Sequence, residues 1–421
     1  MAGEIALTAT LHRTAYQTMA VPQQAFVLLE AVPTQASTPG AAQQVNFCLA
    51  LDRSGSMAGE KMANMKAAAK TVVDRLGPQD TISIVIFDEK AETQVASQAV
   101  TDREAVKRRI EAIQERGGTK MSVGMDAALN ELQRGAIPGR VSRLLLLTDG
   151  QTWEDLLQCE SLAEKARAMG IPLSVLGLGV GEQSNWDPRF LENLAQRSGG
   201  EWYAVDQPDK VSAVFNSTLA AMQGTAVSNA QLTLRLAAEV QPRTVWRVTP
   251  ISRLDHRAVA ERDVQVFLGD VQYGAGQSVL ADVLLPQRAA GAYRLIQADI
   301  TYDVPAANLT GQKVSTDVVI NYTTDASVSN QINPKVMNIA ERVQVHKLQT
   351  QALDEAASGQ KQNATKRLRA AATRLLELGE QEMAQNALNQ AQQIEQSGAM
   401  DPAAAQRMRY QTKRLTENVS P

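Results

Sequence analysis

From residue 45 the chain alternates short apolar runs with stretches of helical periodicity, and this alternation restricts the fold more than any other feature of the sequence. The apolar runs carry hydrophobic residues at consecutive positions, which is typical of strands that are buried on both faces. Such strands form a mostly parallel sheet with helices packed against each side. The predicted strands are 45–51, 81–87, 142–148 and 173–178, and the predicted helices lie near 58–76, 102–115, 121–134, 154–169, 188–198 and 208–223.

The segments on either side of this unit follow other patterns. Residues 1–32 contain two strand-like runs, and residues 227–323 contain six more with the two-residue period of strands. Because two strands alone do not form a stable hairpin, we expect the N-terminal pair to join the later strands. The helical period returns after residue 333, where Asn333-Pro334 and later Asp401-Pro402 have the form of helix starts.

These patterns together predict a doubly wound, mostly parallel α/β sheet that is inserted in an antiparallel β-sandwich and followed by an α-helical C-terminal region. The predicted segments are 1–43 (strands pairing with the later β domain), 44–224 (the α/β domain), 225–328 (the β-sandwich) and 329–421 (the helical region).

Composition excludes several classes of function. The formal net charge of −3 provides no basic field for nucleic acid. No window approaches 18 uninterrupted apolar residues, so we expect no membrane span. The N-terminus lacks the basic and apolar regions of a signal peptide, and Cys48 and Cys159 are best explained as buried free thiols. We therefore expect a cytoplasmic protein.

Polar residues follow the predicted strands at the point where each strand ends. Asp52, Ser54 and Ser56 alternate along the loop after the first strand, and Asp149 follows the strand 142–148. Thr119 lies in a third loop, in the sequence GGT at 117–119. The carboxyl ends of parallel strands meet at one edge of a sheet, which is where ligands bind in such folds. We therefore expect these five side chains to converge.

The five side chains offer only hard oxygen ligands, which select Mg²⁺, Mn²⁺ or Ca²⁺ over zinc or copper. Taken one at a time, each of the three segments that carry these side chains is also compatible with a turn or a helix cap. Ser56 in particular could simply cap the helix that follows it. The joint occurrence of the three segments at successive strand ends is what indicates a metal site. Mg²⁺ suits it best because Mg²⁺ usually keeps some waters, and an incoming carboxylate can replace one.

The segments 52–57 (DRSGSM), 117–119 (GGT) and 147–150 (LTDG) resemble the metal-ion-dependent adhesion site of the von Willebrand factor A (VWA) family. The resemblance covers about residues 44–223. It implies that Ser54, Ser56 and Thr119 bind the metal directly, and that the two aspartates bind through water or change role when a partner docks. The flanking β segments and helical tail are similar in architecture to soluble bacterial and inter-alpha-trypsin-inhibitor-like members.

The resemblance also implies a function that is not enzymatic. A protein of this kind is a metal-dependent interaction module, an adaptor or scaffold that grips an acidic side chain of a partner protein. Partners implied by the resemblance include an AAA-type ATPase and a component of kinase or phosphatase signalling. Lys120, where the family often has a neutral or acidic residue, and Trp153 are candidates for a partner-binding rim.

Two other functions stay open at this point. A metal-dependent phosphoester hydrolase would need a second metal or a placed general base, and Glu60 is the nearest spare carboxylate. A structural protein would instead fill the open metal position with an acidic side chain of its own.

Overall fold

A computed structural model describes residues 4–417, apart from residues 20, 35–42, 151, 153, 180–185, 255, 256, 261 and 398. The chain divides into two compact units. One consists of Thr38–Asn229 with Asp303–Gly311, and the other consists of Met1–Ser37, Ala230–Tyr302 and Gln312–Pro421.

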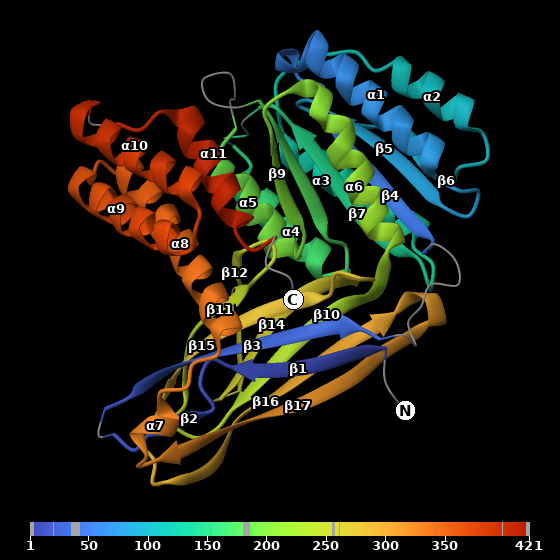
Figure 1. Ribbon diagram of the computed structural model, residues 1–421. Helices are drawn as coiled ribbons and strands as arrows, with labels where there is room; N and C mark the ends of the chain where they lie inside the picture. The colour runs from blue at the N-terminus through green and yellow to red at the C-terminus, as the bar shows by residue number, and fades with distance from the viewer. Residues whose placement is uncertain are drawn as a thin grey trace. The chain divides into compact units, whose positions relative to one another are not determined.

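The α/β unit is built on a sheet of six strands in the order β6-β5-β4-β7-β8-β9 (Figure 1). Neighbouring strands run parallel except at the β5–β6 pair, which is antiparallel. The chain builds the sheet outward from β4, first to one side and then from β7 to the other. The carboxyl ends of β4 and β7 are therefore the switch point, where this class of sheet leaves a crevice. The strands are β4 (Val45–Asp52), β5 (Thr81–Phe87), β6 (Ala91–Ala99), β7 (Val141–Thr148), β8 (Leu173–Leu178) and β9 (Glu201–Val205).

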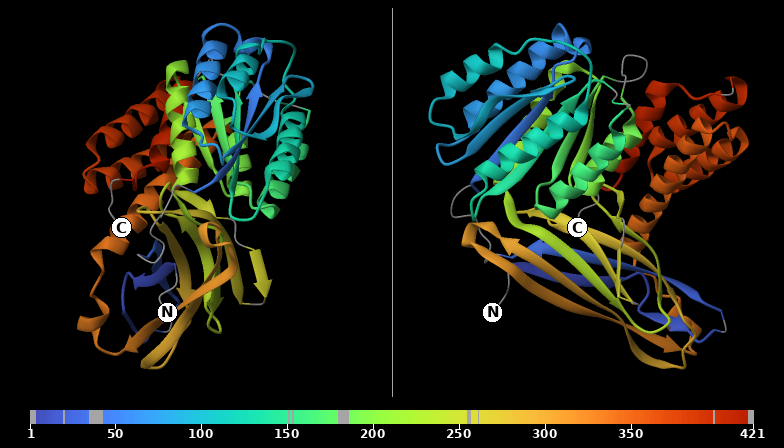
Figure 2. Two further views of the ribbon diagram at one scale, coloured as in Figure 1. Left: turned by 90° about the vertical axis from the view of Figure 1, so that its right-hand side faces the viewer. Right: turned by 180° about the vertical axis from the view of Figure 1, so that it is seen from behind.

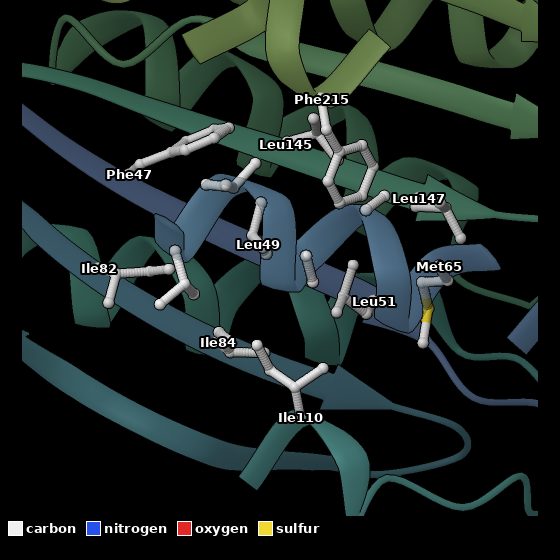
Figure 3. Close-up of a cluster of buried hydrophobic side chains, with 14 of the residues drawn as sticks. Phe47, Leu49, Leu51, Met65, Ile82, Ile84, Ile110, Leu145, Leu147 and Phe215 are labelled. Atoms are coloured by element: carbon white, nitrogen blue, oxygen red, sulfur yellow. The ribbon is translucent and has the colours of Figure 1, made fainter. Parts of the chain in front are cut away.

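Helices cover both faces of this sheet (Figure 2). One face carries α1, α2 and α6, and its core joins Phe47, Leu49 and Leu51 of β4 to Met65 of α1 and Phe215 of α6 (Figure 3). The other face carries α3, α4 and α5. The helices are α1 (Glu60–Arg75), α2 (Arg103–Glu111), α3 (Met121–Gly135), α4 (Leu156–Ala168), α5 (Pro188–Ser198) and α6 (Val211–Gln223).

The second unit joins the N-terminal strands to strands that follow the α/β unit in sequence. β3 pairs antiparallel with β15, so that Val27 lies opposite Ala281. One sheet has the order β1-β3-β15-β11-β12, and the other has the order β13-β14-β10-β16-β17-β2. Their strands are β1 (Ile5–Leu11), β2 (Ala15–Gln17), β3 (Gln23–Pro33), β10 (Thr225–Leu236), β11 (Gln241–Arg247), β12 (Ser252–Leu254), β13 (Arg257–Ala260), β14 (Asp263–Gln272), β15 (Gln277–Leu285), β16 (Gly291–Val304) and β17 (Leu309–Thr323).

The fold class predicted from the sequence is confirmed, with differences in individual elements. β2 was not expected, and it pairs parallel with β17 in a sandwich predicted to be antiparallel. Leu376 and Leu388, which recur in the sequence at the spacing expected of packed helix faces, are 54% and 38% exposed. Alanines pack those faces, since Ala371, Ala384 and their neighbours are small enough to bring the helices close together.

The helical region begins where the sequence predicts. The Asn333 side chain accepts a hydrogen bond from the Val336 N–H at 3.2 Å, and Asp401 caps the last helix in the same way. After the single turn α7 (Ala326–Ser329), the helices are α8 (Pro334–Ala357), α9 (Lys361–Glu377), α10 (Gln381–Ser397) and α11 (Pro402–Lys413). In the part of the chain that the structure describes, no helix is long and apolar enough to cross a membrane.

His346 should make the second unit sensitive to acid. Its ring on α8 meets the Trp246 ring of β11 edge to face, with centroids 6.0 Å apart. Burial, with the nearby charges of Lys413 and Arg409, lowers the pKa of His346 from 6.5 to about 3. The unfolded chain therefore binds a proton below pH 6.5 that the folded chain does not. Stability is intact above pH 6.5 and falls as the pH drops, by about 3 kcal/mol at pH 4 from this group.

We expect His346→Gln to remove this part of the acid sensitivity, because glutamine does not titrate. The free energy of urea unfolding, followed by circular dichroism at pH 7 and pH 4, should fall by about 3 kcal/mol less in the variant than in the wild type. Equal losses in the two proteins would contradict the prediction. His12, whose pKa burial lowers to about 4, contributes its own loss to both proteins.

Candidate metal centre

The end of β4 and the loop that follows it carry Asp52, Ser54 and Ser56. Asp52 is the last residue of β4 and is 0% exposed. Its Oδ1 accepts a hydrogen bond from the Ser54 N–H at 2.8 Å, which holds the loop against the strand end. The residue before α1 is Gly59, and no side chain caps this helix start. Ser56 is therefore not the cap of α1, and its hydroxyl is used elsewhere.

The Ser56 hydroxyl connects this loop to the end of β7. It donates to Asp149 Oδ1 at 2.7 Å and lies 3.1 Å from the Ser54 hydroxyl. Beneath them, the Thr148 hydroxyl donates to Asp52 Oδ2 at 2.6 Å. The structure thus brings Asp52, Ser54, Ser56 and Asp149 together at the switch point of the sheet, as the sequence predicts.

Thr119 reaches the same place from the loop before α3. A Cβ atom on Gly150 would lie 2.9 Å from the Thr119 Oγ1 atom, which places this hydroxyl against the residue that follows Asp149. The Gly55 N–H donates to the Gly117 carbonyl at 3.1 Å and so ties the two loops together. Gly117 has a φ of +72°, a left-handed conformation that glycine adopts without strain.

A buried carboxylate that the sequence did not single out positions these loops. Asp88, directly after β5, accepts hydrogen bonds from Arg53 Nε at 2.8 Å and from Arg116 Nε at 3.1 Å. Its backbone carbonyl accepts from the Lys120 N–H at 2.8 Å. Burial alone would raise the pKa of Asp88, but the Lys90 N–H and the two guanidinium groups bring it below its usual range. Asp88 is therefore an anion that fixes the loop carrying Thr119.

Burial makes the charge on Asp52 costly. It raises the pKa of Asp52 to about 6, against the hydrogen bonds from Thr148 and Ser54 that lower it, and the nearby charge of Asp149 adds to the rise. Asp149 is 1% exposed. Two buried carboxylates facing one another are destabilising unless a cation lies close to them.

Lys61 supplies part of that positive charge. It lies in the first turn of α1, and its Nζ is 2.5 Å from Asp149 Oδ2. The sequence did not single it out, although a lysine in the first turn of a helix that starts beside a metal loop is a usable signal. Lysine there opposes the helix dipole, which favours acidic residues at a helix start.

Of the two residues predicted to form a partner-binding rim, Lys120 and Trp153, the structure describes one. Lys120 is exposed at the start of α3, whereas Trp153 lies outside the described residues. Leu157, in the first turn of α4, is 79% exposed and was not predicted. It borders a groove of about 700 Å³ between α3 and α4, which Ser122 and Val123 line from the other side.

The oxygens at this site fit a hard divalent cation. Within the described residues no cluster of three or more His, Cys, Asp or Glu side chains could hold a metal, so ligation here depends on hydroxyls as well as carboxylates. Asp52 and Ser54 are buried, whereas Ser56 is exposed and Thr119 half-buried. Buried carboxylates and hydroxyls, one of them on an exposed residue, form an all-oxygen site of the kind that suits a hard divalent cation.

Two family models match the chain. One is described as "von Willebrand factor type A domain" and matches residues 46–217. The other is described as "Sll0103-like, C-terminal alpha-helical domain" and matches residues 334–418. The first includes all five predicted ligand positions, and the second coincides with the helical region.

The chain is also similar to individual proteins and to a solved structure. The chain is 28% identical over 335 residues to the "Uncharacterized protein sll0103" of Synechocystis, an alignment that covers 78% of each protein. It is 30% identical over 164 residues to human "Inter-alpha-trypsin inhibitor heavy chain H2", which covers 37% of this chain and 17% of that protein. A structure titled "von Willebrand factor type A from Catenulispora acidiphila" superposes with a TM-score of 0.78 at 18% identity and covers 97% of this chain and 96% of that one. This last similarity is one of fold.

Proposed function

Since the chain carries a von Willebrand factor type A domain, a protein-interaction module that typically binds a divalent metal, we propose that it is a metal-dependent adaptor. In this proposal Asp52, Ser54, Ser56, Thr119 and Asp149 hold one Mg²⁺ ion, and the open side of the site takes an acidic side chain of a partner protein. When bound, the metal supplies the positive charge that attracts the partner's carboxylate.

The observation that carries the proposal is the pair of buried carboxylates beside a group of hydroxyls, of which that of Ser56 belongs to an exposed residue. Asp52 and Asp149 are 0% and 1% exposed, and the hydroxyls of Ser54 and Ser56 lie 3.1 Å apart. The protein's residues orient the ligands from three loops and exclude water from the carboxylates. The exposed Leu157 on the neighbouring helix adds an apolar surface that suits a protein partner.

The two alternatives find less support at this site. A hydrolase needs a general base, and the described titratable group that contacts the five side chains is the Lys61 ammonium, which bonds to Asp149. An internally filled site needs a third carboxylate, and none of the described residues brings one to Asp52 and Asp149. An adaptor needs neither.

We place this interaction in the cytoplasm, because Cys48 and Cys159 are both free and buried. The partner is a protein with an exposed acidic residue; an AAA-type ATPase or a component of kinase or phosphatase signalling would be of this kind.

Removal of the metal should release the partner. Immobilised wild-type protein, incubated with cytosol of its own source in Mg²⁺, should retain proteins that elute on addition of a chelator. Asp52→Asn should not retain them, whereas Asp74→Asn, which removes an exposed carboxylate of α1 that pairs with Lys107, should retain them like the wild type. Partners that stay bound in chelator would refute the proposal.

The hydrolase alternative has its own test. Hydrolysis of p-nitrophenyl phosphate by the purified protein, if it is lost in Asp149→Ala, would favour the hydrolase.

A further inference from the structure

Lys61 places a fixed positive charge directly on one of the proposed metal ligands. The ammonium lies 2.5 Å from Asp149 Oδ2, while the Ser56 hydroxyl donates to Asp149 Oδ1 at 2.7 Å. Both oxygens of this carboxylate therefore have a partner. The Lys61 side chain is only 25% exposed and the Asp149 side chain is 0% exposed, so solvent screens this pair less than a surface ion pair.

A charge count shows what this contact changes. Asp52 and Asp149 bring two negative charges, and Lys61 brings one positive charge. A divalent cation would leave the site with one positive charge in excess, whereas the same site without Lys61 would be neutral. A cation whose charge is only partly balanced binds less tightly, and it attracts an anionic ligand more strongly.

We propose that Lys61 raises the affinity of the metal-loaded site for a carboxylate partner, because its charge offsets part of the negative charge of Asp149 that would otherwise neutralise the metal. This inference rests on the proposed function, since it assumes a metal held by Asp52 and Asp149. Lys61 acts through Asp149 and is a positioning residue. It weakens metal binding and strengthens binding of the partner's acidic group.

A purely structural salt bridge would behave differently. Replacing the lysine of a structural pair leaves a buried carboxylate without its partner, and that disorders the ligand and weakens every binding step. The proposal instead requires two effects of opposite sign from one substitution. This difference separates the two roles in a single set of measurements.

The test uses Mn²⁺ as the metal probe and acetate as the carboxylate probe. Free Mn²⁺ is measured by electron paramagnetic resonance, and acetate binding to the Mn²⁺-loaded protein is measured from the water proton relaxation rate. Lys61→Met keeps an unbranched side chain, one atom shorter than that of lysine, and removes its charge. We expect it to bind Mn²⁺ about tenfold more tightly and acetate about tenfold more weakly than the wild type.

Two controls accompany this variant. Lys61→Arg keeps the charge and should stay near the wild type in both measurements. Lys70→Met makes the same substitution on the same helix, at a residue that pairs with Glu111, and should change neither.

The possible outcomes are distinct. Weaker or unchanged Mn²⁺ binding in Lys61→Met would overturn the inference and leave the proposed function standing. Tighter Mn²⁺ binding with unchanged acetate affinity would also overturn it. Wild-type protein that binds no Mn²⁺ would overturn the proposed function and this inference with it.

Discussion

Asp52→Asn should lose metal binding by at least about a hundredfold while leaving the metal-free protein as stable as the wild type or more so. The loss follows because the variant removes one of the two carboxylates among the five proposed ligands, and a neutral amide is a much weaker partner for a divalent cation. Most substitutions of a completely buried residue destabilise the fold. Unchanged or increased stability of the metal-free Asp52→Asn protein would therefore distinguish a functional carboxylate from a structural one.

The stability of the variant has two physical causes. Burial raises the pKa of Asp52 to about 6, above its unfolded value of 3.8. The folded chain therefore binds the proton more tightly than the unfolded chain, and stability is lost as the pH rises from about 4 to 6. At neutral pH this costs at most about 3 kcal/mol, which an uncharged asparagine avoids.

The hydrogen bonds around residue 52 can also adapt to an amide. The asparagine oxygen can still accept from the Ser54 N–H. Its nitrogen can donate to Thr148 Oγ1, whose own proton can turn to the Gly150 carbonyl 3.2 Å away. No buried group needs to lose its partner.

Thermal unfolding with and without Mg²⁺ measures both effects. A ligand at a hundred times its dissociation constant adds about 2.7 kcal/mol to stability, so the wild type should gain several degrees in Tm and the variant should gain none. Asp74→Asn serves as the control with equal charge change. A variant that is much less stable without metal, or that still gains Tm with Mg²⁺, would contradict the prediction.

Hydrophobic pattern explains which strands the sequence could predict. β4, β5, β7 and β8 lie inside the sheet, so continuous apolar runs identify them. The two edge strands were missed for a common reason. β6, with the sequence AETQVASQA, buries only Val95 completely, and β9 has only five residues and follows a pair of glycines. A strand with one covered side shows little of the pattern on which such predictions depend.

The site divides in a similar way. Four of the five proposed ligand positions could be predicted because they lie in or at the start of the loops that follow β4 and β7, where topology alone brings them together; Thr119 was identified from the GGT turn at 117–119. The contacts of Asp88 and Lys61 could not be predicted, because each joins segments that are far apart in sequence. Asp88 lies 35 residues from Arg53 and meets it at 2.8 Å, and Lys61 lies 88 residues from Asp149. Only the packed structure reveals such pairs.

Gly200→Ala should destabilise the α/β unit by about 3–5 kcal/mol, far more than an exposed glycine normally would. A Cβ atom at this position would lie 2.0 Å from the backbone oxygen of Leu173 and 2.6 Å from its carbonyl carbon. Both atoms belong to the first residue of β8, so no side-chain rotation can relieve the clash. Either β8 or the turn after α5 must move, and both hold inner parts of the sheet in place.

Gly77→Ala is the matched control for this prediction. The nearest atom to its added Cβ is Asp80 Oδ2 at 3.5 Å, an ordinary contact, and Gly77 does not have a positive φ. This substitution should leave the free energy of unfolding within about 1 kcal/mol of the wild type. Urea unfolding followed by tryptophan fluorescence compares the two, because Trp202 is buried in β9 next to the expected clash. Similar midpoints for the two variants would show that the sheet can accept a methyl group at residue 200, and the close approach of the chain to β8 would then not be what requires glycine there.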